Sequence, residues 1–446
     1  MKHDSITRMM AGRRGGPDGA FRFPRRARND SVAMPDRSRR GFTLIELLVT
    51  MALVIIVIMI TASAFESILK NTSRLTASEE SNIEGVVGLE MFRHDLMQMG
   101  YGLPHAYQSI PPNYTEAAVA PASGLNDSGT LSRVPRAVVS LESVTGATDL
   151  TSEGAGSTYS ILNGSDYIAI KGMTVGSSNA SKKWTYVGYS AGGKKPNQWP
   201  NAADNLKSTD RVIVLDRSFT ATGQVVNTMQ YDIGTPSTYW PSNPTVNMND
   251  VFNPGNSKQT YYLYGVDDGS LGMPFNRADY FVARPSNTAK ISSACAPNTG
   301  ILYKATVNHA DGKLRYMPLL DCVADMQVVF GWDVAGSGTA IDESSAYSSD
   351  VSKIQVSSSV GTLPSVIQSF MLSPDDIRTK LKYVKIYIMA QEGRKDPNYV
   401  NTAAVDLGDP GNTSLTKSYS VAALTANSWL NYRWKVYRIV ARPKNF

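Results

Sequence analysis

The segment RRGFTLIELLVTMALVIIVIMITASAF runs from Arg39 to Phe65, and no apolar run of similar length follows it. Between Phe42 and Phe65 the only charged side chain is Glu46. Roughly 24 residues at a rise of about 1.5 Å each form a helix that can cross a bilayer. The run is too long for the apolar part of a secretory signal, and no small-residue cleavage site follows it directly. The sequence therefore predicts a single transmembrane helix over residues 42–65.

Basic residues are concentrated before this helix. Residues 1–41 hold 11 Lys and Arg against 4 Asp and Glu, although the whole 446-residue chain has a net charge of only +6. The remainder has 33 basic and 34 acidic residues, which removes the main support for nucleic-acid binding by the mature body. By the positive-inside rule, residues 1–41 stay in the cytoplasm and residues 66–446 are exported.

Glu46 is an unusual residue for a membrane helix. A carboxylate in the apolar core costs about 2.5 to 3.5 kcal/mol on insertion scales, so it should have a partner. Two interpretations are open from the residues alone. Glu46 either lies close enough to the interface to stay hydrated, or it meets a positive charge within the membrane.

The order of Arg39, Arg40, Gly41, Phe42 and Glu46 before the apolar run resembles the class III signal of type IV pilins and pseudopilins. The resemblance implies that a prepilin peptidase cuts after Gly41 and methylates the new N-terminal Phe42. It also implies that Glu46 recruits the subunit into a fibre. A freed amine on Phe42 of one subunit can neutralise Glu46 of a neighbour, because a paired charge costs less in lipid than a lone one.

The leader of 41 residues is long for that family. Met34 to Gly41 would form a leader of the usual short length, so we expect translation to start at Met34. Residues 1–33 are rich in Arg and show no periodicity, and we interpret them as upstream of the true start or as a disordered extension.

The helix is expected to continue through an amphipathic part, residues 66–100, because no Pro occurs before the stop signal Gly100-Tyr-Gly-Leu-Pro104. One side of this part should pack closely on a sheet, and it carries Gly85, Gly88, Leu89, Phe92, Leu96 and Met99.

A second apolar stripe lies about half a turn away and consists of Ile83, Val87 and Met91. Neighbouring subunits or a loop of the same chain could cover this stripe, and the sequence leaves both alternatives open.

Residues 101–446 are expected to form an exported β-rich domain, which makes the fold class α+β with the long helix packed on an antiparallel sheet. Charged residues are scarce, at 18%, and Gly and Tyr are common. The strongest hairpin signal pairs 301–307 with 313–319 around Asp311-Gly312. Long loops are expected at 104–136 and 336–364. Further strands are expected at 167–170, 184–189, 211–215, 260–264, 280–283, 326–332, 383–389 and 434–440.

Cys295 and Cys322 are the only two cysteines, and both fall in the exported part. A disulfide between them is expected there and would contribute about 3 to 4 kcal/mol in the loop-entropy model. Two free thiols are the alternative.

Motifs for catalysis or metal binding are weak, and we expect no enzyme activity, cofactor, metal or catalytic residue. The exported part has three histidines, none near another in sequence, and no CxxC motif. Gly188 to Gly192 matches a nucleophile elbow, but the residues after it cannot form the helix that the elbow requires. The acidic loops 266–270 and 406–412 lack EF-hand spacing, which favours solvated turns over calcium sites.

Two further segments narrow the resemblance. Met91 to Pro104 is similar to the end of the N-terminal helix in PilW-like large minor pilins, and in J-type pseudopilins the helix ends similarly. The segments Cys322 to Asp333 and Arg442 to Phe446 resemble the C-terminal part of PilW-type proteins.

The resemblance implies a minor pilin that assembles with other minor and major pilins to prime or cap a pilus, with a prepilin peptidase and the inner-membrane assembly machinery as partners. The protein would span the inner membrane once, with a periplasmic C-terminal domain, and would later reach the cell surface. The alternatives are a pseudopilin of a type II secretion system and, more remotely, a membrane-tethered enzyme or a tip adhesin.

Overall fold

A computed structural model describes most of the chain after the leader, and its contacts divide into two units, residues 1–66 and 67–446. The fold class is α+β, as the sequence predicts. The described residues are 43–108, 112–128, 134–144, 149–151, 158–190, 195–221, 223–232, 241, 243–246 and 250–446.

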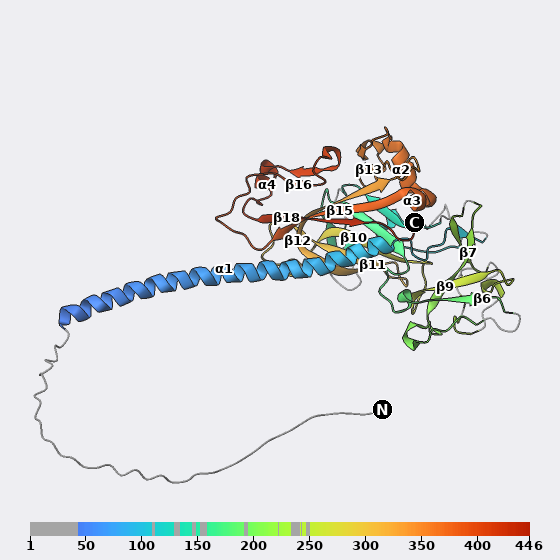
Figure 1. Cartoon of the computed structure of the whole chain (residues 1–446), viewed down its shortest axis with the longest axis horizontal. Coiled ribbons are helices and arrows are strands. Elements are labelled where there is room, and N and C mark those ends of the chain that lie inside the picture. The colour runs from blue at the N-terminus through green and yellow to red at the C-terminus, as the bar shows by residue number, and fades with distance from the viewer. Residues whose placement is uncertain are drawn as a thin grey trace, which may run out of the picture. The chain divides into compact units, whose positions relative to one another are not determined.

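One long helix, α1 (Leu44–Gln98), opens the described chain (Figure 1). It begins after Thr43, whose hydroxyl oxygen accepts a hydrogen bond from the Glu46 amide at 3.3 Å. A side-chain oxygen in this position satisfies one of the free amides of the first turn. The helix ends where the Gly100 amide turns away to the Lys171 carbonyl at 2.9 Å, so the stop signal acts as predicted.

The large sheet of the second unit contains 11 strands, and every pairing within it is antiparallel. Its central path is β14-β13-β12-β11-β10-β4-β3, with β15 and β18 added beside β12, and β5 and β2 beside β10. The strands are β2 (Val138–Leu141), β3 (Asp149–Thr151), β4 (Thr158–Ile161), β5 (Tyr167–Gly172), β10 (Asn276–Pro285), β11 (Gly300–Val307), β12 (Leu314–Trp332), β13 (Asp342–Ser344), β14 (Val356–Ser357), β15 (Leu381–Glu392) and β18 (Arg433–Ala441).

A smaller sheet of five strands has the order β1-β8-β7-β9-β6 and lies at one end of the large one (Figure 1). The strands are β1 (Ala106–Tyr107), β6 (Trp184–Gly188), β7 (Arg211–Phe219), β8 (Val225–Gln230) and β9 (Thr260–Asp267). The remaining elements are the hairpin of β16 (Val405–Leu407) and β17 (Lys417–Tyr419) and the short helices α2 (Pro364–Leu372), α3 (Pro374–Lys380) and α4 (Val421–Ala426).

The predicted hairpin is present, and Gly312 in its turn has φ +69°, the left-handed conformation that favours glycine. The strand that follows differs from the prediction, because residues 314–319 and 326–332 belong to one strand of 19 residues, β12. Its first half pairs with β11 and its second half with β15, with a register shift in both ladders near Cys322. One strand can therefore serve two neighbours in turn.

The C-terminal part of α1 packs on the large sheet through the predicted apolar face. Phe92 stacks on Tyr280 of β10 with ring centroids 3.9 Å apart. Gly88 lies so close to β12 that a Cβ atom there would come within 2.4 Å of the Leu319 carbonyl oxygen. The predicted close backbone approach is therefore confirmed.

The opposite face of β15 is also buried, which the alternation along this strand does not predict. Ile386 and its even-numbered neighbours share the core with α1, whereas Tyr387 and Met389 belong to a second cluster. That cluster is completed by Leu407, Leu415, Leu424, Trp429 and Tyr432. The sheet is therefore covered on both sides, and Figure 1 shows β16 and α4 beside β15 and β18.

The segment 336–364 is not the mobile loop that its composition indicates. It contains β13, which pairs with β12, and β14, which pairs with β13. Ala346 and Ile354 are buried in the main core. A small polar residue can be buried here when its hydroxyl has a hydrogen-bond partner. Ser344, for example, accepts a hydrogen bond from the Trp332 indole at 2.9 Å.

The described residues 112–128 contain no strand and one short 3-10 helix, Ala122–Leu125, and they are tied to the sheet by buried charges. Lys171 of β5 lies 2.7 Å from Glu116 and 2.6 Å from Asp127, and all three side chains are fully buried. Arg277 of β10 also pairs with Glu116, at 3.1 Å. Burial raises the pKa of Asp127, but Lys171 and Arg136 outweigh burial and hold this pKa below its usual value. Asp127 is therefore negatively charged at neutral pH.

Replacement of Lys171 by Met should destabilise the second unit by about 3 to 5 kcal/mol, because it leaves buried carboxylates with too little positive charge. Unfolding of the full chain in urea would measure the change. Lys313→Met is the matched control, since Lys313 forms a solvent-exposed pair with Asp311 and should cost less than about 1 kcal/mol. Equal losses in the two variants would contradict a role for the network.

Candidate functional site

The first part of α1 is an apolar rod whose side chains are not covered by the described chain. The segment Leu44–Glu66 has 23 residues and a mean hydropathy of 2.8. None of the residues in its most apolar part is buried. This length and composition are sufficient for one membrane crossing. The apolar side chains therefore need lipid, other helices or both around them.

Glu46 lies in the first turn of α1 and is exposed, as the neighbouring apolar residues are. Thr43 and Glu46 stand in the T-x-x-E order of a capping box, and a carboxylate near a helix N-terminus is favoured by the helix dipole. Glu46 thus has a local structural use besides any role in assembly. Arg39, Arg40, Gly41 and Phe42 lie outside the described residues.

A second carboxylate of α1, Asp95, was not identified by sequence reasoning as a functional residue. It is only 3% exposed, and it lies 2.5 Å from the Lys304 ammonium of β11. The Tyr280 hydroxyl donates to the same carboxylate at 2.6 Å. These contacts fix one end of α1 to two strands of the sheet. Its position between Phe92 and Leu96 in the sequence could have indicated this role, because an acidic side chain on an apolar helix face requires a buried partner.

The second apolar stripe remains uncovered in the described chain. Val87 is 64% exposed and Met91 is 37% exposed, although Phe92 next to them is completely buried. No loop among the described residues covers Val87 and Met91, which argues against the intramolecular alternative for these two positions. The side chain of Ile83 lies outside the described residues.

The expected disulfide is present and joins Cys295 to Cys322, with Cα atoms 4.9 Å apart. Cys322 has φ +54° and lies where β12 changes partner from β11 to β15. The bond therefore connects this position to the segment that precedes β11.

The other motifs do not converge on a catalytic or metal centre in the described residues. Among them, no group of three or more His, Cys, Asp and Glu side chains could hold a metal ion. Asp409, expected in a solvated turn, is instead paired with Lys385 and with Arg438. His309 contacts the Asn276 amide oxygen at 2.9 Å.

Comparison with known proteins gives one match. Residues 36–62 match the family model described as the prokaryotic N-terminal methylation motif. The chain carries a type IV pilin-like signal. No curated protein and no solved structure gives a significant match.

This motif, together with the apolar helix, fits a membrane-anchored protein of the type IV pilin or pseudopilin kind. It implies processing by a prepilin peptidase and association with pilus-type machinery, and it suggests a structural rather than an enzymatic role. The match ends at residue 62, so the second unit, residues 67–446, is not covered by any comparison.

Replacement of Asp95 by Leu should destabilise the packing of α1 on the sheet by about 3 to 5 kcal/mol, because Lys304 would remain buried without its partner. Denaturant unfolding of the full chain would measure the loss.

The double variant Asp95→Leu/Lys304→Met is the informative control, since two apolar side chains can replace a buried pair. It should recover most of the loss. A double variant no more stable than Asp95→Leu would show that the pair does not act as a unit.

Proposed function

We propose that this protein is a PilW-like minor type IV pilin, cut after Gly41, that assembles with other minor pilins to prime or cap a pilus. The observation that carries the proposal is Glu46, a charged side chain in an otherwise apolar and uncovered segment that matches the N-terminal methylation motif.

The assembly mechanism is noncovalent. Processing frees a positive amine on Phe42, and this amine forms an ion pair with Glu46 of an adjoining subunit within a bundle of apolar helices. Both charges are costly alone in lipid and cost less together. The apolar side chains of Leu44–Glu66 then pack among neighbouring helices, which the exposure of this segment in the single chain supports.

The size of the exported part supports a position at the tip. The second unit, residues 67–446, would crowd a helical fibre if it were repeated along the length. A pseudopilin of a type II secretion system shares the anchor and remains the second candidate. Gene deletion separates them, since the first loses surface pili and the second loses secreted clients.

Variants at Glu46 and Thr43 should separate charge from helix capping. Glu46→Gln preserves a side chain suited to the capping box but removes the charge, and it should reduce incorporation into sheared pili on the order of tenfold or more. Thr43→Ala removes the hydroxyl that accepts a hydrogen bond from the Glu46 amide but keeps the charge of Glu46, so this variant should still assemble. Immunoblots of pilus and membrane fractions would measure both.

Equal membrane levels of the two variants would exclude a simple loss of insertion. Full incorporation of Glu46→Gln would refute the charge mechanism. N-terminal sequencing provides an independent test, and a mature chain that retains residues before Phe42 would refute processing at Gly41.

Charged residues on the second stripe should also block assembly. Val87→Glu and Met91→Glu place a charge on the exposed side of α1, where a neighbouring subunit is expected, and should cause a severe loss of incorporation. Folding should be unchanged because neither side chain is buried in the chain. Glu90→Gln, at an exposed residue paired with Arg93, is a control that also changes the charge by one unit. Normal assembly of the stripe variants would show that this face is not a subunit contact.

A further inference from the structure

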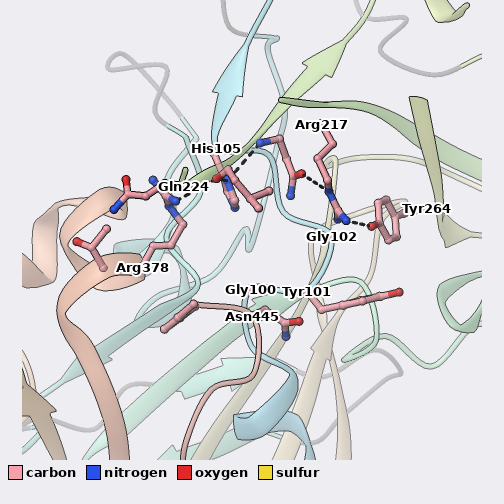
Figure 2. A pocket seen from close by; sticks show the side chains of 13 residues that line it. Gly100, Tyr101, Gly102, His105, Arg217, Gln224, Tyr264, Arg378 and Asn445 are labelled. Atoms are coloured by element: carbon pink, nitrogen blue, oxygen red, sulfur yellow. Dashed lines mark hydrogen bonds between the residues drawn. The ribbon is translucent and has the colours of Figure 1, made fainter. Parts of the chain in front are cut away.

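A pocket of about 490 Å³ lies where the end of α1 meets the smaller sheet, and its function is not explained by assembly. The turn Gly100–Gly102 forms one wall, the β7–β8 hairpin a second, and α3 with the last two residues of the described chain a third (Figure 2). A pocket of this size can hold a small organic molecule.

Two guanidinium groups line the pocket from different elements. Arg217 of β7 donates to the Asn227 side chain at 3.2 Å and to the Tyr264 hydroxyl at 3.3 Å. Arg378 of α3 donates to the Val225 carbonyl at 3.2 Å. Neutral acceptors hold Arg217, whereas Arg378 also donates to the Asp375 carboxylate, and each guanidinium keeps further N–H groups for another partner.

His105 shows that the two positive charges converge. Its ring lies between the two arginines in the close view of the pocket (Figure 2). Burial is the largest cause that lowers the pKa of His105 to about 4, and the positive charges of Arg378 and Arg217 contribute in the same direction. The imidazole is therefore neutral at physiological pH, and the positive charge of the pocket comes from the arginines.

Negative charge does not cancel these arginines inside the pocket. Among the described lining residues there is no Asp or Glu side chain. Asp375 pairs with Arg378 at 3.0 Å, but its side chain is 77% exposed and lies outside the lining. The pocket therefore favours an anionic group that both guanidiniums can reach.

Aromatic rings continue outward from Arg217. The guanidinium lies over Tyr262, 4.6 Å from the ring centroid. Trp184 lies 6.4 Å from Tyr262 and 5.1 Å from Trp199, all measured between ring centroids. Tyr186 lies 6.2 Å from Trp199. Trp184 and Tyr186 point out of β6 and are more than one-third exposed, so the smaller sheet presents a row of accessible rings beside the pocket.

We propose that this pocket and the adjacent row of rings bind an acidic saccharide. Arg217 and Arg378 hold the carboxylate, the amides of Gln224 and Asn445 contact hydroxyl groups, and a sugar face packs on the rings of Tyr262 and Trp184. Ring faces suit the C–H surfaces of sugars, and fixed guanidiniums suit carboxylates. The proposal does not depend on whether the chain is a minor pilin or a pseudopilin.

Single-stranded nucleic acid is the competing ligand for a surface of rings and arginines. The sequence after the leader carries a net charge of −1, and only two positive side chains line the pocket. Nucleic-acid binding normally uses many phosphate contacts, so the small local charge favours a ligand with isolated carboxylates.

Titration of the purified full chain in detergent with tri-galacturonate tests the proposal, with tryptophan fluorescence and calorimetry as readouts. We expect saturable binding that changes the emission, because Trp184 and Trp199 belong to the row of rings that continues outward from Arg217 and Tyr262. Arg217→Ala and Arg378→Ala should each weaken binding about tenfold or more, as expected for loss of a charged hydrogen bond. Trp184→Ala should weaken binding and reduce the fluorescence change.

Arg433→Ala is the matched control. Arg433 also lies over a tyrosine, 4.2 Å from the Tyr399 centroid, and pairs with a carboxylate, but it does not line the pocket. It should bind tri-galacturonate as the wild type does. An equal loss in Arg433→Ala would show nonspecific charge attraction and overturn the proposal.

Three other ligands define the remaining outcomes. Neutral maltotriose that binds as tightly would refute the role of the arginines, and inorganic phosphate that binds as tightly would refute the saccharide. Tighter binding of an oligothymidylate would replace the proposal with nucleic-acid binding. Absence of tri-galacturonate binding to a chain with a normal unfolding transition would also overturn it.

Discussion

The first helix has to satisfy two different surroundings with one continuous backbone. Its first part is apolar on all sides and is not buried by the described chain, whereas its last turns are buried on one face against the large sheet. Each part contains one carboxylate that its apolar surroundings disfavour, Glu46 in the first and Asp95 in the second. The contrast between these two acids explains much of the molecule's organisation.

Asp95 is satisfied within the chain. Lys304 and Tyr280 reach it from adjacent strands, so the charge fixes the helix to the sheet and costs little additional ordering. Glu46 is exposed, and its amide donates a hydrogen bond to the Thr43 hydroxyl at the start of α1. The free-energy cost of inserting that charge into lipid must be offset by something outside the single chain, and under the proposed function a second processed subunit would supply the matching charge. The stability of the second unit and the competence for assembly would then depend on two separate acids, which can be tested separately.

Local patterns were sufficient to predict the elements that depend on neighbouring residues. The stop at Gly100, the close approach at Gly88 and the turn at Gly312 all follow from short-range spacing. The disulfide was also predictable, since the chain has only two cysteines and the charge pattern predicts that both are exported. The apolar face of α1 was recognised because it repeats at helical spacing.

Features that depend on distant partners were missed for a physical reason. Lys171 and Glu116 are 55 positions apart in the chain, and neither has a local pattern that indicates burial. The second face of β15 is covered by residues 407–432, and Lys385 within it looks exposed until Glu343 and Asp409 are seen to pair with it. Arg217 and Arg378 meet near His105 only because α3 packs beside the β7–β8 hairpin.

Several charged side chains of the second unit are buried in ion pairs. Few charges remain on a surface when several are buried in ion pairs, and here Lys171, Arg277 and Asp279 are completely buried together with Glu116. Buried pairs of this kind add little net stability compared with apolar residues, but they penalise any arrangement that separates them. The described residues 112–128 can therefore be held against the sheet with little regular secondary structure. The turn Gly100–Gly102 ends α1 and also forms one wall of the pocket. The hydrogen bond from the Gly100 amide to the Lys171 carbonyl therefore holds the end of the helix and a wall of the pocket in place together.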